Sequence, residues 1–194
     1  MGTDIHGVFQ RQTADGWEDV PSKFEENRHY QLFAVLAGVR NGYGFAGAPT
    51  GEVVKPISEP RGLPPDFPCE DDEHPAPSGE SLWMGDHSHS WLTAHEMLEW
   101  AEHAPVVTKT GVVSRETFAT WDRKSRPAEY CAAVSGRGAS TVEWHGGEPP
   151  AGRWAHIRVT WLSPLSEELS YFFDEVRRLQ ALHGQVRFVF GFDS

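Results

Sequence analysis

Two short segments of the chain concentrate side chains of the kind that bind metal ions. Asp4 and His6 lie two residues apart in "DIH", and Asp86, His87 and His89 lie together in "GDHSHSWLT". In an extended segment, residues two apart point to the same side, so each pair can converge on one point. Imidazole and carboxylate groups together suit a divalent transition metal such as zinc or manganese. The spacing predicts a metal site with Asp4, His6, His87 and His89 as ligands and Asp86 as a catalytic base or orienting group.

A simpler interpretation of the same residues stays open. The chain has 10 histidines, so some close pairs are expected by chance. His87 or His89 can also hydrogen-bond loop carbonyls, and Asp86 and Ser90 can act as turn formers.

The charge of the chain limits its partners. Lys and Arg total 17 against 28 Asp and Glu, a net charge of −11, and no basic run exceeds two residues. A surface that follows a duplex nucleic acid is therefore not expected. A small anionic ligand or nucleotide is still compatible, and Arg28, Arg40, Arg61 and Arg126 are candidates to bind it, unless they are ordinary surface or ion-pair arginines. Arg40 and Arg61 would neutralise phosphate, with Tyr43 or Trp91 as a stacking surface. The alternative for Arg61 is an ion pair that braces a long loop.

The cysteines and the apolar patterning bear on the compartment. Cys69 and Cys131 show no CxxC spacing, and we expect both to be reduced thiols. The first residues lack the pattern of a secretory signal, and no apolar stretch reaches membrane-spanning length. The expectation is a cytoplasmic protein without a membrane partner, of unknown oligomeric state.

The first half of the chain predicts a hairpin and a helix. Residues 4–20 alternate on both sides of a turn at Asp15-Gly16, as in a β-hairpin. Apolar residues at helical spacing predict a helix over 28–40, capped by Asn27 and ending before Gly42. Residues 42–80 are rich in Pro and Gly, which predicts a long loop there.

The second half gives clearer signals. Thr93 and Glu96 predict a capping box that begins a helix over 93–104, with "GDHSHSW" as the loop before it. Ser114 is expected to cap a short helix. Towards the C-terminus the pattern predicts a strand in "RWAHIRVTWL", a helix over 164–183 capped by Ser163 and stopped by Gly184, and a last strand in "QVRFVFGFDS".

These elements predict the fold class. We expect one α+β domain over residues 1–194, in which the N-terminal hairpin and the C-terminal strand-helix-strand unit build a mixed or antiparallel sheet covered by helices. Leu165, Leu169, Phe172, Phe173, Val176, Leu179 and Leu182 form the predicted apolar face of the last helix.

Several blocks of the sequence resemble those of a known family. "GTDIHGVFQ", "RHYQLFAVLAGVRNG", "PISEPRGLP", "HSHSWLT" and "RFVFGFD" are similar to an uncharacterised family of small proteins encoded by tailed bacteriophages and some bacterial genomes. The resemblance implies a phage-associated protein in the host cell cytoplasm. It implies no reaction.

Two functional hypotheses follow. The first is a metal-dependent hydrolase of a small phosphoester or nucleotide, in which the metal activates water. The alternative is a counter-defence protein without enzymatic activity that sequesters a nucleotide signal or blocks a host protein. Nucleophilic catalysis and a phosphate-binding loop are not indicated, because the chain lacks both a G-x-S-x-G and a P-loop pattern.

Overall fold

A computed structural model describes residues 2–43, 53–68, 83–134 and 140–194, and its contacts divide the chain into two compact units. Unit 1 comprises residues 1–103 and 169–194, and unit 2 comprises residues 104–168. Each unit has its own sheet, one antiparallel and one mixed, which confirms the α+β class. The single domain stays a prediction. Much of the expected Pro/Gly-rich loop, including Cys69, lies outside the described residues.

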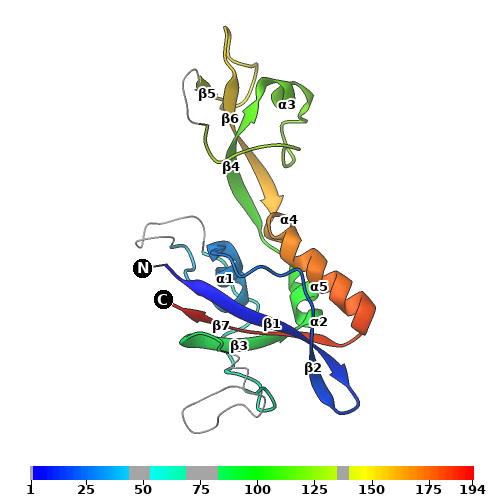
Figure 1. Cartoon of the computed structure of the whole chain (residues 1–194). Coiled ribbons are helices and arrows are strands. Elements are labelled where there is room, and N and C mark those ends of the chain that lie inside the picture. The colour runs from blue at the N-terminus through cyan, green and yellow to red at the C-terminus, as the bar shows by residue number, and fades with distance from the viewer. Residues whose placement is uncertain (1, 44–52, 69–82, 135–139) are drawn as a thin grey trace. The chain divides into compact units, whose positions relative to one another are not determined.

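Unit 1 contains a four-stranded antiparallel sheet in the order β2-β1-β7-β3 (Figure 1). Strands β1 (Asp4–Thr13) and β2 (Gly16–Val20) form the predicted hairpin. Strand β7 (Val186–Asp193) is the predicted last strand, and it lies between β1 and β3 (His87–Thr93). The last strand of the chain is therefore central, and it pairs with the first.

Strand β3 corrects one sequence prediction. The segment before the capped helix was expected to be a loop, but residues 87–93 form a strand that pairs with β7 through Ser90–Thr93. A register irregularity separates His87 from Ser90 in this pairing. The segment is polar, so its own pattern does not predict a strand. The physical reason is pairing with β7, whose inward side chains bury Ser90 and Leu92 completely.

The sheet of unit 1 has two covered faces. The inner face carries Ile5, Phe9, Leu92, Phe188, Phe190 and Phe192. Rings of Phe33, from α1 (Tyr30–Ala37), and Phe172, from α5 (Ser170–His183), pack on it. The outer face carries Asp4, His6, Val8, Gln10, Trp91, Thr93, Arg187, Val189 and Asp193. Phe67, Met84 and Leu63 cover part of the outer face around Val8, Trp91 and Val189.

The helices of unit 1 confirm some predicted boundaries and correct others. Helix α2 (Ala94–Glu102) begins with the predicted capping box, because Thr93 and Glu96 each accept a bond from the other's backbone. Helix α1 (Tyr30–Ala37) begins later and ends earlier than predicted. His29 rather than Asn27 occupies its N-cap, and Gly38 rather than Gly42 ends it by adopting a left-handed φ of 71°.

The C-terminal helix is shorter and broken. Strand β6 (His156–Pro164) extends through Ser163 and Pro164, which were expected to open the helix. Both residues pair with strand β4 (Val106–Ser114) instead. The helix is split into α4 (Leu165–Glu168) and α5 (Ser170–His183), and it ends at Gly184 as predicted. The predicted apolar face is buried up to Leu179, but Leu182 is exposed.

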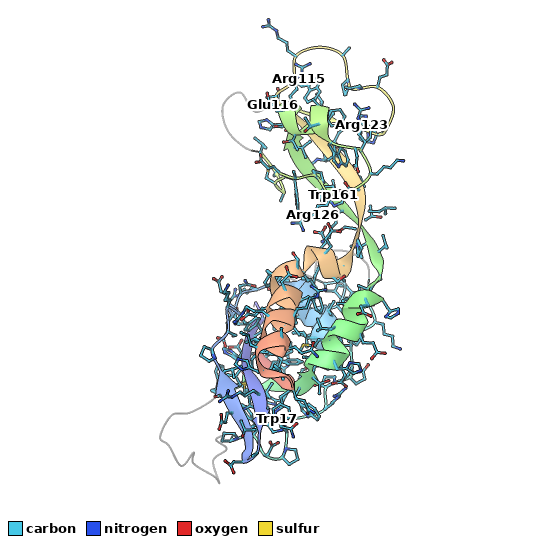
Figure 2. The ribbon with its side chains drawn as sticks, turned by 90° about the vertical axis from the view of Figure 1, so that its right-hand side faces the viewer. Trp17, Arg115, Glu116, Arg123, Arg126 and Trp161 are labelled. Carbon is cyan, nitrogen blue, oxygen red and sulfur yellow. The ribbon has the colours of Figure 1, made fainter. Side chains whose placement is uncertain are left out.

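Unit 2 is a three-stranded sheet in the order β4-β6-β5 with one short helix. Strands β4 (Val106–Ser114) and β6 form a long antiparallel ribbon, and β5 (Thr141–Glu143) runs parallel to β6. Helix α3 (Arg115–Thr120) starts at its predicted cap, Ser114. The core contains Val113, Phe118, Trp121, Trp154, Ile157, Val159 and Trp161, the last labelled on β6 in Figure 2. The strands before and after the last helix thus belong to different sheets.

Candidate functional site

The predicted site residues of unit 1 lie around the ends of β1, β3 and β7, where the two described chain ends lie side by side (Figure 1). The antiparallel pairing of β1 with β7 places Asp4 opposite Asp193 and His6 opposite Gly191. Pairing of β3 with β7 places His87 opposite Phe192. The sheet thus gathers three polar strand ends, but it distributes their side chains over two faces.

On the outer face, Asp4 is held in an ion pair by Arg28. The Arg28 guanidinium donates two hydrogen bonds to the Asp4 carboxylate, at 2.5 and 2.7 Å. These bonds lower the pKa of Asp4 below its ordinary value. The Asp4 carboxylate therefore stays ionised and is engaged by Arg28.

His6 lies between two carboxylates of the outer face. Its Nδ1 is 3.5 Å from Glu26 Oε2, and its Nε2 is 3.7 Å from Asp193 Oδ2. The Nε2 atom is buried and makes no hydrogen bond within the described residues. The Trp83 ring contacts the imidazole at a centroid distance of 4.7 Å. The His6 imidazole is therefore enclosed between two carboxylates and an indole ring.

His89 shares the outer face with His6. A side chain at Gly191 would meet both His89 Cδ2, at 2.6 Å, and the Met84 carbonyl oxygen, so His89 lies directly over this glycine. His89 Nε2 is 2.9 Å from the Gly85 carbonyl oxygen. The loop-carbonyl interpretation of this histidine is therefore confirmed, and Gly191 is required for the close approach.

His87 points to the inner face, away from His6 and His89. Its ring stacks on Phe192 at 6.1 Å between centroids. Its two nitrogens lie near hydroxyl groups, Nδ1 at 3.0 Å from Ser88 Oγ and Nε2 at 3.1 Å from Ser194 Oγ. The structure therefore separates the two histidines of "HSH" and places only His89 on the face of His6.

A series of polar contacts continues from His87 to Arg40. Ser194 Oγ is 3.0 Å from Thr3 Oγ1, which accepts a 2.7 Å hydrogen bond from Arg40 Nε. We call Thr3, Arg40, His87, Ser88 and Ser194 the strand-end cluster. Arg40 and Ser88, at its two ends, both adopt a left-handed backbone, with φ of 55° and 53°. Such conformations are costly for residues other than glycine and concentrate at functional sites.

The remaining predicted residues lie elsewhere or are exposed. The Arg61 guanidinium donates to Glu96 Oε1 at 2.5 Å and lies 5.2 Å from the Trp91 ring centre. Burial raises the pKa of Glu96, but hydrogen bonds from Arg61 and Thr93 outweigh this effect and lower the pKa overall. This contact matches the bracing interpretation of Arg61, whereas its ligand role stays a prediction.

Tyr43 and Asp86 contact the site through backbone hydrogen bonds, and their side chains are exposed. Tyr43 donates its N–H to the Arg40 carbonyl at 2.9 Å, and its side chain is 54% exposed. Asp86 donates its N–H to the Phe192 carbonyl at 2.6 Å, and its exposed carboxylate contacts no partner within the described residues. The Tyr43 ring is thus exposed, and its backbone is held to that of Arg40.

The described residues contain no group of three or more His, Cys, Asp or Glu side chains arranged to hold a metal ion. The reason lies in the geometry above: His87 faces the other side of the sheet, and Arg28 engages Asp4. The zinc or manganese site stays a prediction that this arrangement does not favour.

Sequence reasoning missed several members of the site. Thr3 and Ser194 supply hydroxyl groups, while Glu26 and Asp193 lie on either side of His6. The signal available was the prediction of strands at both ends of the chain. Pairing them would have placed Asp193 beside Asp4, but the strand order could not be determined from the sequence.

Comparisons with known proteins identify no relative, so the evidence for a function comes from the geometry of the site. No protein-family model matches the chain, and no curated protein or solved structure is significantly similar to it. The resemblance to the phage-encoded family therefore stays a prediction. In the part of the chain that the structure describes, no helix has both the length and the apolar character needed to cross a membrane.

Proposed function

We propose that the protein binds a small phosphate-bearing anion of the nucleotide class at the strand-end cluster. The observation that carries the proposal is the continuous series of contacts from Arg40 through Thr3 and Ser194 to His87. Guanidinium, hydroxyl and imidazole groups are all donors to phosphate oxygens. Four separate segments contribute them at one end of the sheet, and none of the five side chains is a carboxylate.

The surroundings of the cluster support a nucleotide over a bare anion. Tyr43 is half exposed and is tied through its backbone to Arg40. An exposed aromatic ring beside a phosphate-binding arginine provides a stacking surface for a base. With a net charge of −11, the chain as a whole repels anions, so the arginine and the histidine must act locally.

The proposed biological role is ligand binding without catalysis. The cluster holds hydroxyl groups and one histidine, which suits capture of a ligand. A protein of this kind would sequester a nucleotide signal, and in a phage-encoded protein that activity would counter a host defence.

A thermal-shift screen tests this proposal. The probes are inorganic phosphate, pyrophosphate, ATP and a cyclic dinucleotide, each added to the wild type and to His87→Ala. A ligand at about 100 times its dissociation constant adds about 2.7 kcal/mol of stability, which raises Tm by roughly 5–10 °C at this size. We expect a shift with at least one probe that is lost in His87→Ala. No shift with any of the four would overturn the proposal.

A second candidate is the metal-dependent hydrolase of a phosphoester, which one observation favours. His6 Nε2 is buried without a hydrogen bond and lies 3.7 Å from Asp193 Oδ2, on the face that His89 shares. His6 and Asp193 would then be two of the ligands, although the described residues bring no third ligand into place beside them. Elemental analysis of protein purified without a metal-affinity tag tests it, with His6→Ala as comparison. Less than a tenth of an equivalent of transition metal in the wild type would rule it out.

A further inference from the structure

A cavity of about 370 Å³ lies at the other end of β3 and β7 from the strand-end cluster. Thr93, at the end of β3, and Val186, at the start of β7, both line it. Strand β7 spans eight residues, so the two places are about 25 Å apart. We call this cavity the indole pocket. It is lined by Trp17, Thr93, Ala94, His95, Gln180, Gly184, Gln185 and Val186.

One wall of the indole pocket is fixed by Arg187, a buried arginine in an ion pair with the half-exposed Asp66. The Arg187 guanidinium lies 4.3 Å from the Trp17 ring centre and is almost fully buried. Arg187 is itself held by two hydrogen bonds to Asp66, at 2.9 and 3.0 Å, and by one to Gln10 at 2.8 Å. Trp17, labelled in Figure 2, is thus a rigid wall on strand β2. A preorganised aromatic wall lowers the entropy cost of binding a flat ligand.

Two polar side chains of the indole pocket, those of Gln180 and Gln185, are available to a ligand. Gln180 comes from the last turns of α5, and Gln185 lies between α5 and β7. Neither side chain makes a hydrogen bond to the described residues. Each amide offers both donors and an acceptor. Ala94 and Val186 are buried and supply apolar surface.

We propose that the indole pocket binds a planar, uncharged heteroaromatic molecule of the nucleobase or nucleoside class. The ring would pack on Trp17, and the Gln180 and Gln185 amides would bond to its edge. The volume falls in the range of about 300–1,000 Å³ typical of small-molecule sites. The described lining holds no Asp, Glu, Lys or Arg side chain, which favours a neutral ligand over a phosphate. The site is separate from the strand-end cluster and independent of the function proposed there.

Titration of ¹⁵N-labelled full-length protein with adenosine, guanosine, cytidine or uridine tests this inference by NMR. The chain has eight tryptophans, and Trp17→Leu assigns the indole N–H signal of Trp17. Binding of one nucleoside should move that signal and the Gln180 and Gln185 side-chain signals, and leave the other indole signals in place. No movement of the Trp17 signal with any of the four up to 5 mM would overturn the proposal.

Variants distinguish specific nucleoside binding from nonspecific binding. The double variant Gln180→Ala with Gln185→Ala should weaken nucleoside binding at least about tenfold, because each lost hydrogen bond contributes around threefold to tenfold. Leu182→Ala is the matched control, since Leu182 is exposed on α5 and does not line the pocket. An equal affinity in the double variant and the control would contradict the assigned amides. His87→Ala should leave nucleoside binding at the indole pocket unchanged. The two proposed sites can therefore be tested, and rejected, independently of each other.

Discussion

The two faces of the unit 1 sheet are stabilised in different ways, although the same strands build both. On the inner face, Phe9, Phe172 and Phe188 are fully buried and pack ring against ring at 4.5–6.1 Å. On the outer face, ion pairs such as Arg187 with Asp66 hold the covering segment in place. Alternation along a strand therefore separates a face held by ring packing from one whose covering segment is held in part by ion pairs.

The contrast extends to the histidines at the strand ends. His6, on the outer face, lies between Glu26 and Asp193. His87, on the inner face, has hydroxyl neighbours at both nitrogens. The same residue type thus has carboxylate neighbours in one place and hydroxyl neighbours in the other, and strand pairing provides those neighbours.

The largest effect is expected from Phe188→Ala on the inner face. Phe188 is completely buried against Phe9, Phe24 and Phe172. Removing its ring leaves a cavity, and the free energy of unfolding should fall by about 3–5 kcal/mol. Urea denaturation at pH 7 and pH 4 measures it, and the loss should be the same at both values. A loss of stability that changed with pH would contradict the view that ring packing, rather than charge, stabilises the inner face.

A smaller loss is expected from Gly191→Ala on the outer face. A methyl group there would overlap the Met84 carbonyl oxygen and crowd His89 Cδ2. Because the obstacle is backbone, the 84–89 segment must shift, and the free energy of unfolding should fall by about 1–3 kcal/mol. Chemical denaturation measures this, and unchanged stability would show that the covering segment does not press on the sheet.

A still smaller and pH-dependent loss is expected from Asp66→Asn. Hydrogen bonds from Arg187 lower the pKa of Asp66 in the folded protein. The carboxylate therefore contributes stability above the unfolded pKa of about 4, and this contribution disappears as the pH falls through the folded value. Asp66 is half exposed, so the loss at pH 7 should be about 1 kcal/mol after solvent screening.

The pH dependence itself is the control for Asp66→Asn. Denaturation curves of wild type and variant should differ at pH 7 and converge towards pH 3, because the wild-type carboxylate then becomes protonated. A difference that persists unchanged at pH 3 would assign the effect to lost packing, and the outer face would then not be held by charge.

The sequence predicted those elements that are determined by interactions between residues close together in the chain. The hairpin, the Thr93 capping box and the Gly184 stop were confirmed, because turn residues and caps act within a few positions. Strand β3 was missed, because pairing with β7 rather than its own composition makes it a strand. Ser163 and Pro164 were misassigned, because a strand pairing with β4 overrode a good capping pattern.

The candidate site was predicted in location but not in arrangement. "DIH" and "GDHSH" do lie on adjacent sheet ends, joined through β7. Their division between two faces depends on register and on the irregularity between His87 and Ser90, neither of which a single sequence reveals. Nothing in the sequence around Thr3 or Ser194 marks them as partners of His87, because they meet only through the pairing of β1 with β7.

The most direct test of the proposed function compares the two histidines in one binding experiment. Calorimetric titration with the best phosphate-bearing probe is carried out on wild type, His87→Ala and His6→Ala. We expect binding to weaken at least about tenfold in His87→Ala, since a contact to a charged group is lost, and to stay unchanged in His6→Ala. Equal binding in the two variants, or a loss confined to His6→Ala, would contradict a site at the strand-end cluster.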